Sequence, residues 1–150
     1  MPKLRTALSL SGAQYGALVE AMALLVWARL LIAFVPLRHW RRQFGERAAH
    51  DGNHPELTEA ERETARLVVH AIDRAARNLP FAFICLPRAL AARWMLARRG
   101  VDSQLYIGVG RDSAGETSLH AWLKAGEDWI TGYQESIAYN AFAQRKGPAR

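Results

Sequence analysis

The longest apolar run in the chain predicts a helix over residues 16–37. It consists of good helix formers, and only Glu20 and Arg29 interrupt it, projecting from opposite sides. A helix that is apolar nearly all round is buried in a core, against a partner or in a membrane. We expect burial in the core first, docking on a partner or membrane surface second and a membrane span third, because Arg29 lies near the centre. Pro36 ends or kinks this helix.

A second helix is predicted from the capping box formed by Thr58 and Glu61, and it continues to about Asn78. Leu79 and Pro80 close it. One side of this helix carries an apolar stripe, which indicates the face that packs on the core. The stripe consists of Thr64, Leu67, Val68, Ala71, Ile72 and Ala75.

A third helix is predicted to begin at Cys85 and to end at Gly100. Pro87 suits its first turn, where the missing N–H costs nothing. Cys85, Ala89 and Leu96 share one face of this helix together with Ala92. Small alanine side chains on that face would allow another element, such as a sheet, to approach closely.

The remaining pattern alternates between apolar and polar residues and predicts three short strands. The strands are expected over residues 104–109, 119–123 and 128–131, with turns over 111–115 and 125–127. The predicted fold class is therefore α+β, with the helix from Cys85 packed on a small antiparallel sheet. We divide the chain into an apolar helix and basic linker over 1–55 and a core over 56–150, together one compact domain.

Composition adds a net charge of +6 and a single cysteine in 150 residues. One cysteine cannot form an internal disulfide, so a reducing, cytoplasmic setting is the simplest expectation. A basic balance is compatible with an acidic partner, but the sequence has no nucleic-acid motif and no phosphate loop, and a solvated basic surface is the plainer interpretation. The basic cluster over 38–42 either favours the helix C-terminus or anchors residues 16–42 at an anionic membrane surface.

Two histidines and an aspartate lie within residues 50–54, but no third ligand with suitable spacing follows them. Gly52 and Pro55 favour a solvated loop there. We expect no metal and no cofactor.

Candidate chemistry rests on Cys85 and His120. A thiol attacks a carbonyl as the thiolate, which the N-terminal end of a helix and a neighbouring imidazolium both stabilise. Arg88, one turn further on, would favour the thiolate as well. The plainer alternative for Cys85 is a small buried hydrophobic side chain.

Two segments of the chain resemble the leader peptidases of lasso-peptide biosynthesis, a family in the transglutaminase-like superfamily of cysteine proteases. These segments are CLPRALAARWMLARRGVDSQLYIGVG and LHAWLKAGEDWITG. The resemblance covers about residues 80–132. It implies that Cys85 is the nucleophile and His120 the general base and acid. It also implies a helix-on-sheet peptidase core, with Arg88 and Trp122 as residues that contact substrate.

The family places an aspartate about a dozen residues after the histidine, and here that position is Gly132. Asp128 is the nearest acid and is our prediction for the third catalytic residue; Thr131 or a backbone carbonyl are the alternatives for orienting His120. For the oxyanion, the backbone N–H of Cys85 or of the next residue is available.

The resemblance implies three partners: a precursor peptide with leader and core, a separate leader-binding protein, and an ATP-dependent macrolactam synthetase. No leader-binding module is recognisable over residues 1–50. Two other functions stay open, namely another acyl transfer or deamidation by the same thiol, and a non-catalytic protein that binds a partner or a membrane surface.

Overall fold

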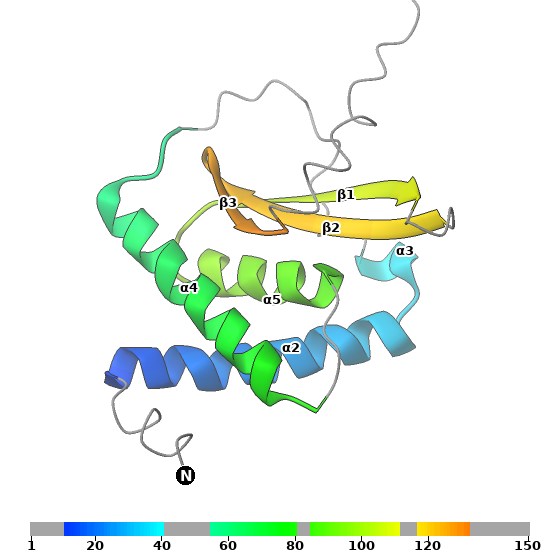
Figure 1. The fold of residues 1–150 in the computed structure, drawn as a ribbon, viewed down its shortest axis with the longest axis horizontal. Coiled ribbons are helices and arrows are strands. Elements are labelled where there is room, and N and C mark those ends of the chain that lie inside the picture. Colours follow the sequence, from blue (N-terminus) through cyan, green and yellow to red (C-terminus); the bar gives the residue numbers. More distant parts are fainter. Residues whose placement is uncertain (1–10, 41–54, 81–84, 112–116, 133–150) are drawn as a thin grey trace, which may run out of the picture.

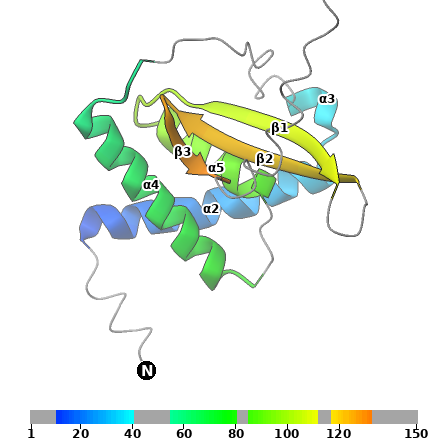
Figure 2. The ribbon, with the colours of Figure 1, turned by 45° about the horizontal axis from the view of Figure 1, so that its top comes forward.

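The computed structural model describes residues 11–40, 55–80, 85–111 and 117–132, which form a layer of helices packed on one face of a small sheet (Figure 1). Helix α5 lies between the sheet and helix α2, and α4 crosses beside both (Figures 1 and 2). The elements in order are α2 (Gly12–Phe34), α3 (Leu37–Trp40), α4 (Glu59–Asn78), α5 (Cys85–Ala97), β1 (Gln104–Arg111), β2 (Thr117–Ala125) and β3 (Asp128–Thr131). The predicted α+β class with an antiparallel sheet matches this architecture.

Helix α2 begins earlier than the sequence predicted because a second capping box precedes it. The Ser11 side chain accepts a hydrogen bond from the Gln14 N–H at 3.3 Å, and the Gln14 side chain accepts one from the Ser11 N–H at 3.1 Å. The helix ends at Phe34, just before Pro36, as predicted.

The expectation that this helix is buried is right for one face. Ala17, Ala21, Leu25 and Ala28 are buried against α4 and α5. The opposite side is open to solvent, and its Phe34 side chain is 78% exposed. The apolar sequence of α2 therefore does not mean that the whole helix is buried, because only one of its sides packs on the core.

Helix α4 has the predicted capping box and the predicted end. Thr58 and Glu61 exchange both hydrogen bonds, and the contact with Thr58 lowers the pKa of the Glu61 carboxyl. The buried stripe is Ala65, Val68, Ala71, Ile72 and Ala75, so Ala65 takes the place predicted for Thr64. Thr64 instead donates its hydroxyl hydrogen to the Ala60 carbonyl at 2.9 Å.

Helix α5 starts at Cys85 as predicted and is surrounded on nearly all sides. Four consecutive residues, 89–92, have no exposed surface, because three of them are alanines that let α2, α4 and the sheet approach closely. Gly100 at φ +74° closes the helix: its N–H bonds to the Ala97 carbonyl and the Val101 N–H bonds to the Leu96 carbonyl.

The sheet has the order β1-β2-β3 and is antiparallel throughout. In the β1–β2 pair Tyr106 lies opposite Trp122 and Gly108 lies opposite His120. β1 continues to Arg111, past the predicted end, and the rest of the predicted turn lies outside the described residues. Alternate residues of β2, Ala121 and Leu123, join the core formed with α5.

Candidate active site

Cys85 is the first residue of α5, and its side chain is half-buried against the core. The N–H groups of a first helical turn point toward the helix start, where they and the helix dipole favour negative charge. Pro87 is buried in this turn and supplies no N–H, so Cys85 and Leu86 are the donors nearest to the thiol. This is the setting that a nucleophilic thiolate requires.

Arg88 forms an ion pair with Asp73 of α4, through Nη2 and Oδ1. The contact ties the first turn of α5 to α4. Because the charge of Arg88 is shared with a carboxylate, its effect on the thiol is weaker than the sequence alone suggested. Contact between Arg88 and a substrate stays a prediction.

His120 lies in the first half of β2, and its side chain is half-buried. It alternates with the core residues Ala121 and Leu123, so it shares the other face of the strand with Trp122. Gly108 lies directly opposite on β1 and carries no side chain. The register therefore places a residue without a side chain directly across from His120 on the neighbouring strand.

The structure brings the elements that carry Cys85 and His120 together. α5 packs on β2, and α5 begins at the end of the domain where β1 ends and β2 starts (Figure 1). The structure thus shows that the helix that begins with Cys85 packs on the strand that contains His120. Direct contact between thiol and imidazole remains a prediction.

Asp128 lies well along the sheet from His120, so its role as the third catalytic residue stays a prediction that the strand register disfavours. It is the first residue of β3 and pairs with Ala125, which is five residues along β2 from His120. At about 3.3 Å per residue the separation along the strand is about 17 Å. The Asp128 carboxylate instead accepts a hydrogen bond from Arg62 Nε at 3.2 Å, and this contact raises the pKa of Arg62.

The alternative, Thr131, is also distant. It pairs with Leu123, three residues along β2 from His120, which corresponds to about 10 Å along the strand. Gly132 follows at φ +78°, and a Cβ built there would lie 2.8 Å from the Trp122 Cβ. The position where the resemblance to leader peptidases would place an aspartate therefore has no space for a side chain.

Trp122 is 7% exposed, so it offers little surface to a substrate and the prediction of substrate contact is not supported. Its ring stacks on Tyr106 at 6.2 Å between centroids, with 6° between the planes. Burial, and secondarily the charge of Glu127, raise the pKa of the Tyr106 hydroxyl. This aromatic pair includes Trp122, which shares a face of β2 with His120. The sequence gives no sign of the pair until the register of β1 on β2 is known.

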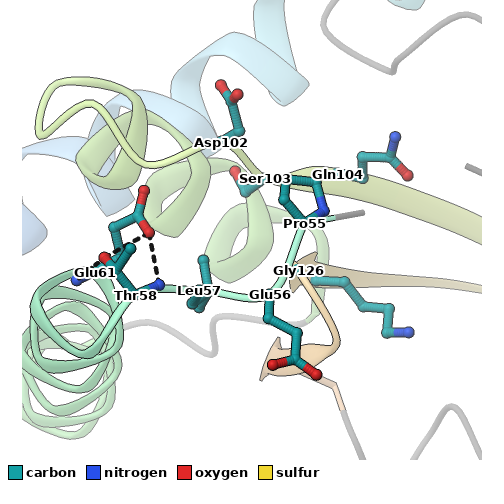
Figure 3. Close-up of a pocket in the computed structure, with 10 residues that line it drawn as sticks. Pro55, Glu56, Leu57, Thr58, Glu61, Asp102, Ser103, Gln104 and Gly126 are labelled. Carbon is teal, nitrogen blue, oxygen red and sulfur yellow. Dashed lines mark hydrogen bonds between the residues drawn. The ribbon is translucent and has the colours of Figure 1, made fainter. Parts of the chain in front are cut away.

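A pocket of about 540 Å³ lies at the opposite end of the sheet (Figure 3). It is bounded by the first turn of α4, the start of β1 and the β2–β3 hairpin. Gln104 and Lys124, which line it, form a cross-strand pair four residues along the ladder from the Gly108–His120 pair, about 13 Å away. The pocket is therefore separate from the predicted catalytic pair.

Comparison with known proteins assigns the fold family. A family model described as "Transglutaminase-like superfamily" matches residues 28–143, from within α2 to beyond β3. The match includes both Cys85 and His120. No curated protein and no solved structure matches the chain.

Proposed function

The chain belongs to the transglutaminase-like superfamily, and from this premise we propose that it is a cysteine peptidase that removes the leader from a lasso-peptide precursor. One observation carries the proposal: the single cysteine opens α5, which packs on the strand that holds His120. Proteins of this superfamily are usually cysteine-dependent enzymes, which makes chemistry at Cys85 the first expectation.

In the acylation step, the Cys85 thiolate attacks the carbonyl carbon of the bond to be cut. The carbonyl electron pair moves to oxygen, and the N–H groups of Cys85 and Leu86 are the donors available to the oxyanion. When the tetrahedral intermediate collapses, the C–N bond breaks. The protonated His120 gives its proton to the leaving amine, and a thioester remains on Cys85.

In the second step, neutral His120 takes a proton from water, and the resulting hydroxide adds to the thioester carbon. The C–S bond then breaks, which restores the thiolate beside a protonated imidazole, and the new carboxylic acid leaves and releases its proton to solvent. Hydrolysis therefore requires that water reach the thioester beside His120, whereas transfer to another amine requires that water be excluded.

The lasso-precursor substrate is supported by the segments around the two residues. Cys-Leu-x-Arg-Ala-Leu lies on the first turns of α5, and His-Ala-Trp lies within β2. The reaction would supply the free amine that an ATP-dependent synthetase needs for ring closure. A separate leader-binding protein would present the precursor.

The test is cleavage of a precursor peptide followed by mass spectrometry, with and without the leader-binding partner. Cys85→Ala should remove cleavage, and His120→Ala should lower the rate by about 10²–10⁴-fold, the usual contribution of a general acid–base group. His70→Ala is the matched control, because His70 is exposed on α4. Circular dichroism should show all variants folded. Unchanged cleavage by Cys85→Ala would contradict the proposal.

A second function, acyl transfer or deamidation, uses the same thioester. The products distinguish it from hydrolysis, because deamidation exchanges an NH₂ group for OH without fragmenting the peptide and transfer joins two molecules. The superfamily match is compatible with either chemistry. Intact but heavier peptide would favour this function.

A non-catalytic role is distinguished by the rate of alkylation of the single cysteine as a function of pH. A catalytic thiolate alkylates quickly below neutral pH. Slow alkylation that increases only toward about pH 8.5, where an ordinary thiol ionises, would favour a structural Cys85. Because the chain has one cysteine, the adduct mass reports on this residue alone.

A further inference from the structure

Exposed apolar side chains are concentrated on α2. Of the seven large hydrophobic side chains that are exposed in the described part of the chain, six lie on this helix, and the seventh is Ile107 of β1. Single exposed apolar residues are ordinary on a protein surface, whereas a contiguous group marks an interaction site. The six are Tyr15, Val19, Val26, Trp27, Leu30 and Phe34.

These six side chains form one stripe along the helix. At 100° per residue they project within an arc of about 120°, and the buried face of α2 lies on the opposite side. Helix α2 therefore has two apolar faces. One is used by the core, and the other, which we call the outer stripe, faces solvent.

The charges beside the outer stripe are positive. Arg29 is exposed along one edge, and Arg38 and His39 are exposed just beyond the end of the helix. Glu20 lies along the other edge and is the only acid in α2, but Arg99 Nη2 donates to its Oε2 at 2.6 Å and Arg98 Nε lies 3.4 Å from its Oε1. The carboxylate is thereby neutralised, and the face carries a net positive charge.

Helix α2 is long and apolar enough to cross a membrane. Its buried face, however, packs on α4 and α5, so crossing a bilayer would require that core to open. A helix lying in the plane of the membrane keeps the core and buries the outer stripe. In that position Arg29 can extend its guanidinium to the lipid phosphates while its aliphatic stem stays beside the stripe.

We propose that α2 docks this protein on an anionic membrane surface. The outer stripe enters the boundary between headgroups and acyl chains, and Arg29 and Arg38 contact headgroup phosphates. A second copy of the chain is the less suitable occupant, since α2 has no free acid to oppose these cations. The proposal does not depend on Cys85 chemistry.

Sedimentation of the full chain with vesicles tests this proposal. The protein should bind phosphatidylcholine–phosphatidylserine vesicles more tightly than phosphatidylcholine vesicles, and added salt should weaken that preference. Trp27→Gln with Leu30→Gln should lower the partition coefficient about tenfold or more, because two apolar side chains lose their burial. Arg29→Gln with Arg38→Gln should reduce the preference for phosphatidylserine by about fivefold for each arginine. Ile107→Gln is the matched control for an exposed apolar residue elsewhere and should bind like the unaltered chain.

Two results would overturn the proposal. One is equal sedimentation of the unaltered chain and the Trp27→Gln/Leu30→Gln variant. The other is a dimer, seen by analytical ultracentrifugation, that this variant abolishes while the unaltered chain binds no vesicles; the stripe would then be an interface between two copies. Peptide cleavage is not measured here, so neither result bears on the proposed peptidase.

Discussion

The structure predicts that no side chain is tolerated at Gly132, the position where the resemblance to leader peptidases would place an aspartate. Its φ of +78° lies in the left-handed region, and an added Cβ would lie 2.8 Å from the Trp122 Cβ and 3.2 Å from the Ala121 carbonyl oxygen. These neighbours belong to β2, in the middle of the sheet, so they cannot rotate away as the end of a flexible side chain would.

The cost of Gly132→Ala has two parts. The left-handed conformation costs about 1–2 kcal/mol for a residue with a Cβ, and overpacking against β2 adds about 1–3 kcal/mol. The free energy of unfolding should therefore fall by about 2–5 kcal/mol, a large share of the 5–15 kcal/mol that is typical of a domain. Gly132→Asp should cost at least as much and should not increase peptide cleavage.

Gly100→Ala is the matched control, because Gly100 has φ +74° but nothing within 4 Å of the added Cβ. It should lose only the conformational part, about 1–2 kcal/mol. Urea unfolding of both variants, followed by circular dichroism, measures the difference. If Gly132→Ala is no less stable than Gly100→Ala, then the close approach of Gly132 to Trp122 is not real.

Two further predictions concern the site and the core. Asp128→Asn should leave the rate of precursor cleavage unchanged, because Asp128 pairs with Arg62 about 17 Å along β2 from His120; a loss of more than tenfold without unfolding would instead support Asp128 as a catalytic residue. Leu25→Ala should lower the free energy of unfolding by about 2–5 kcal/mol, since Leu25 is fully buried, whereas Leu30→Ala on the outer stripe should change it by about 0.5 kcal/mol or less. Equal effects of the two leucine substitutions in urea unfolding would mean that the buried and exposed faces of α2 are misassigned.

Local sequence signals determined most of the elements of this protein. The capping box at Thr58 and Glu61 set the start of α4, and Pro36 set the end of α2. Gly100 set the end of α5. Each of these signals acts through hydrogen bonds or backbone sterics within a few residues, so it can be read without knowledge of the rest of the chain. The Ser11 capping box was equally local and was missed because it precedes the obvious apolar run.

The tertiary structure determined which face of each helix or strand is buried and which residues lie next to it. The sequence of α2 is apolar on both sides, and only its packing on α4 and α5 selects which side is buried. Likewise, Asp128 is near His120 in sequence, but the two-residue hairpin and the β2–β3 register carry it to the far end of the strand. Such relations depend on contacts between residues that are distant in the chain, which local patterns do not encode.

The sequence by itself identified Cys85 at a helix start and His120 in a strand, because a lone thiol, a proline-containing first turn and an alternating run are all local features. The tertiary structure decided that α5 packs on β2, that Arg88 is tied to Asp73 and that Trp122 is buried on Tyr106. It also showed why Gly132 carries no side chain: the chain passes so close to β2 that a Cβ would overlap Trp122, a constraint that arises only once the sheet has formed.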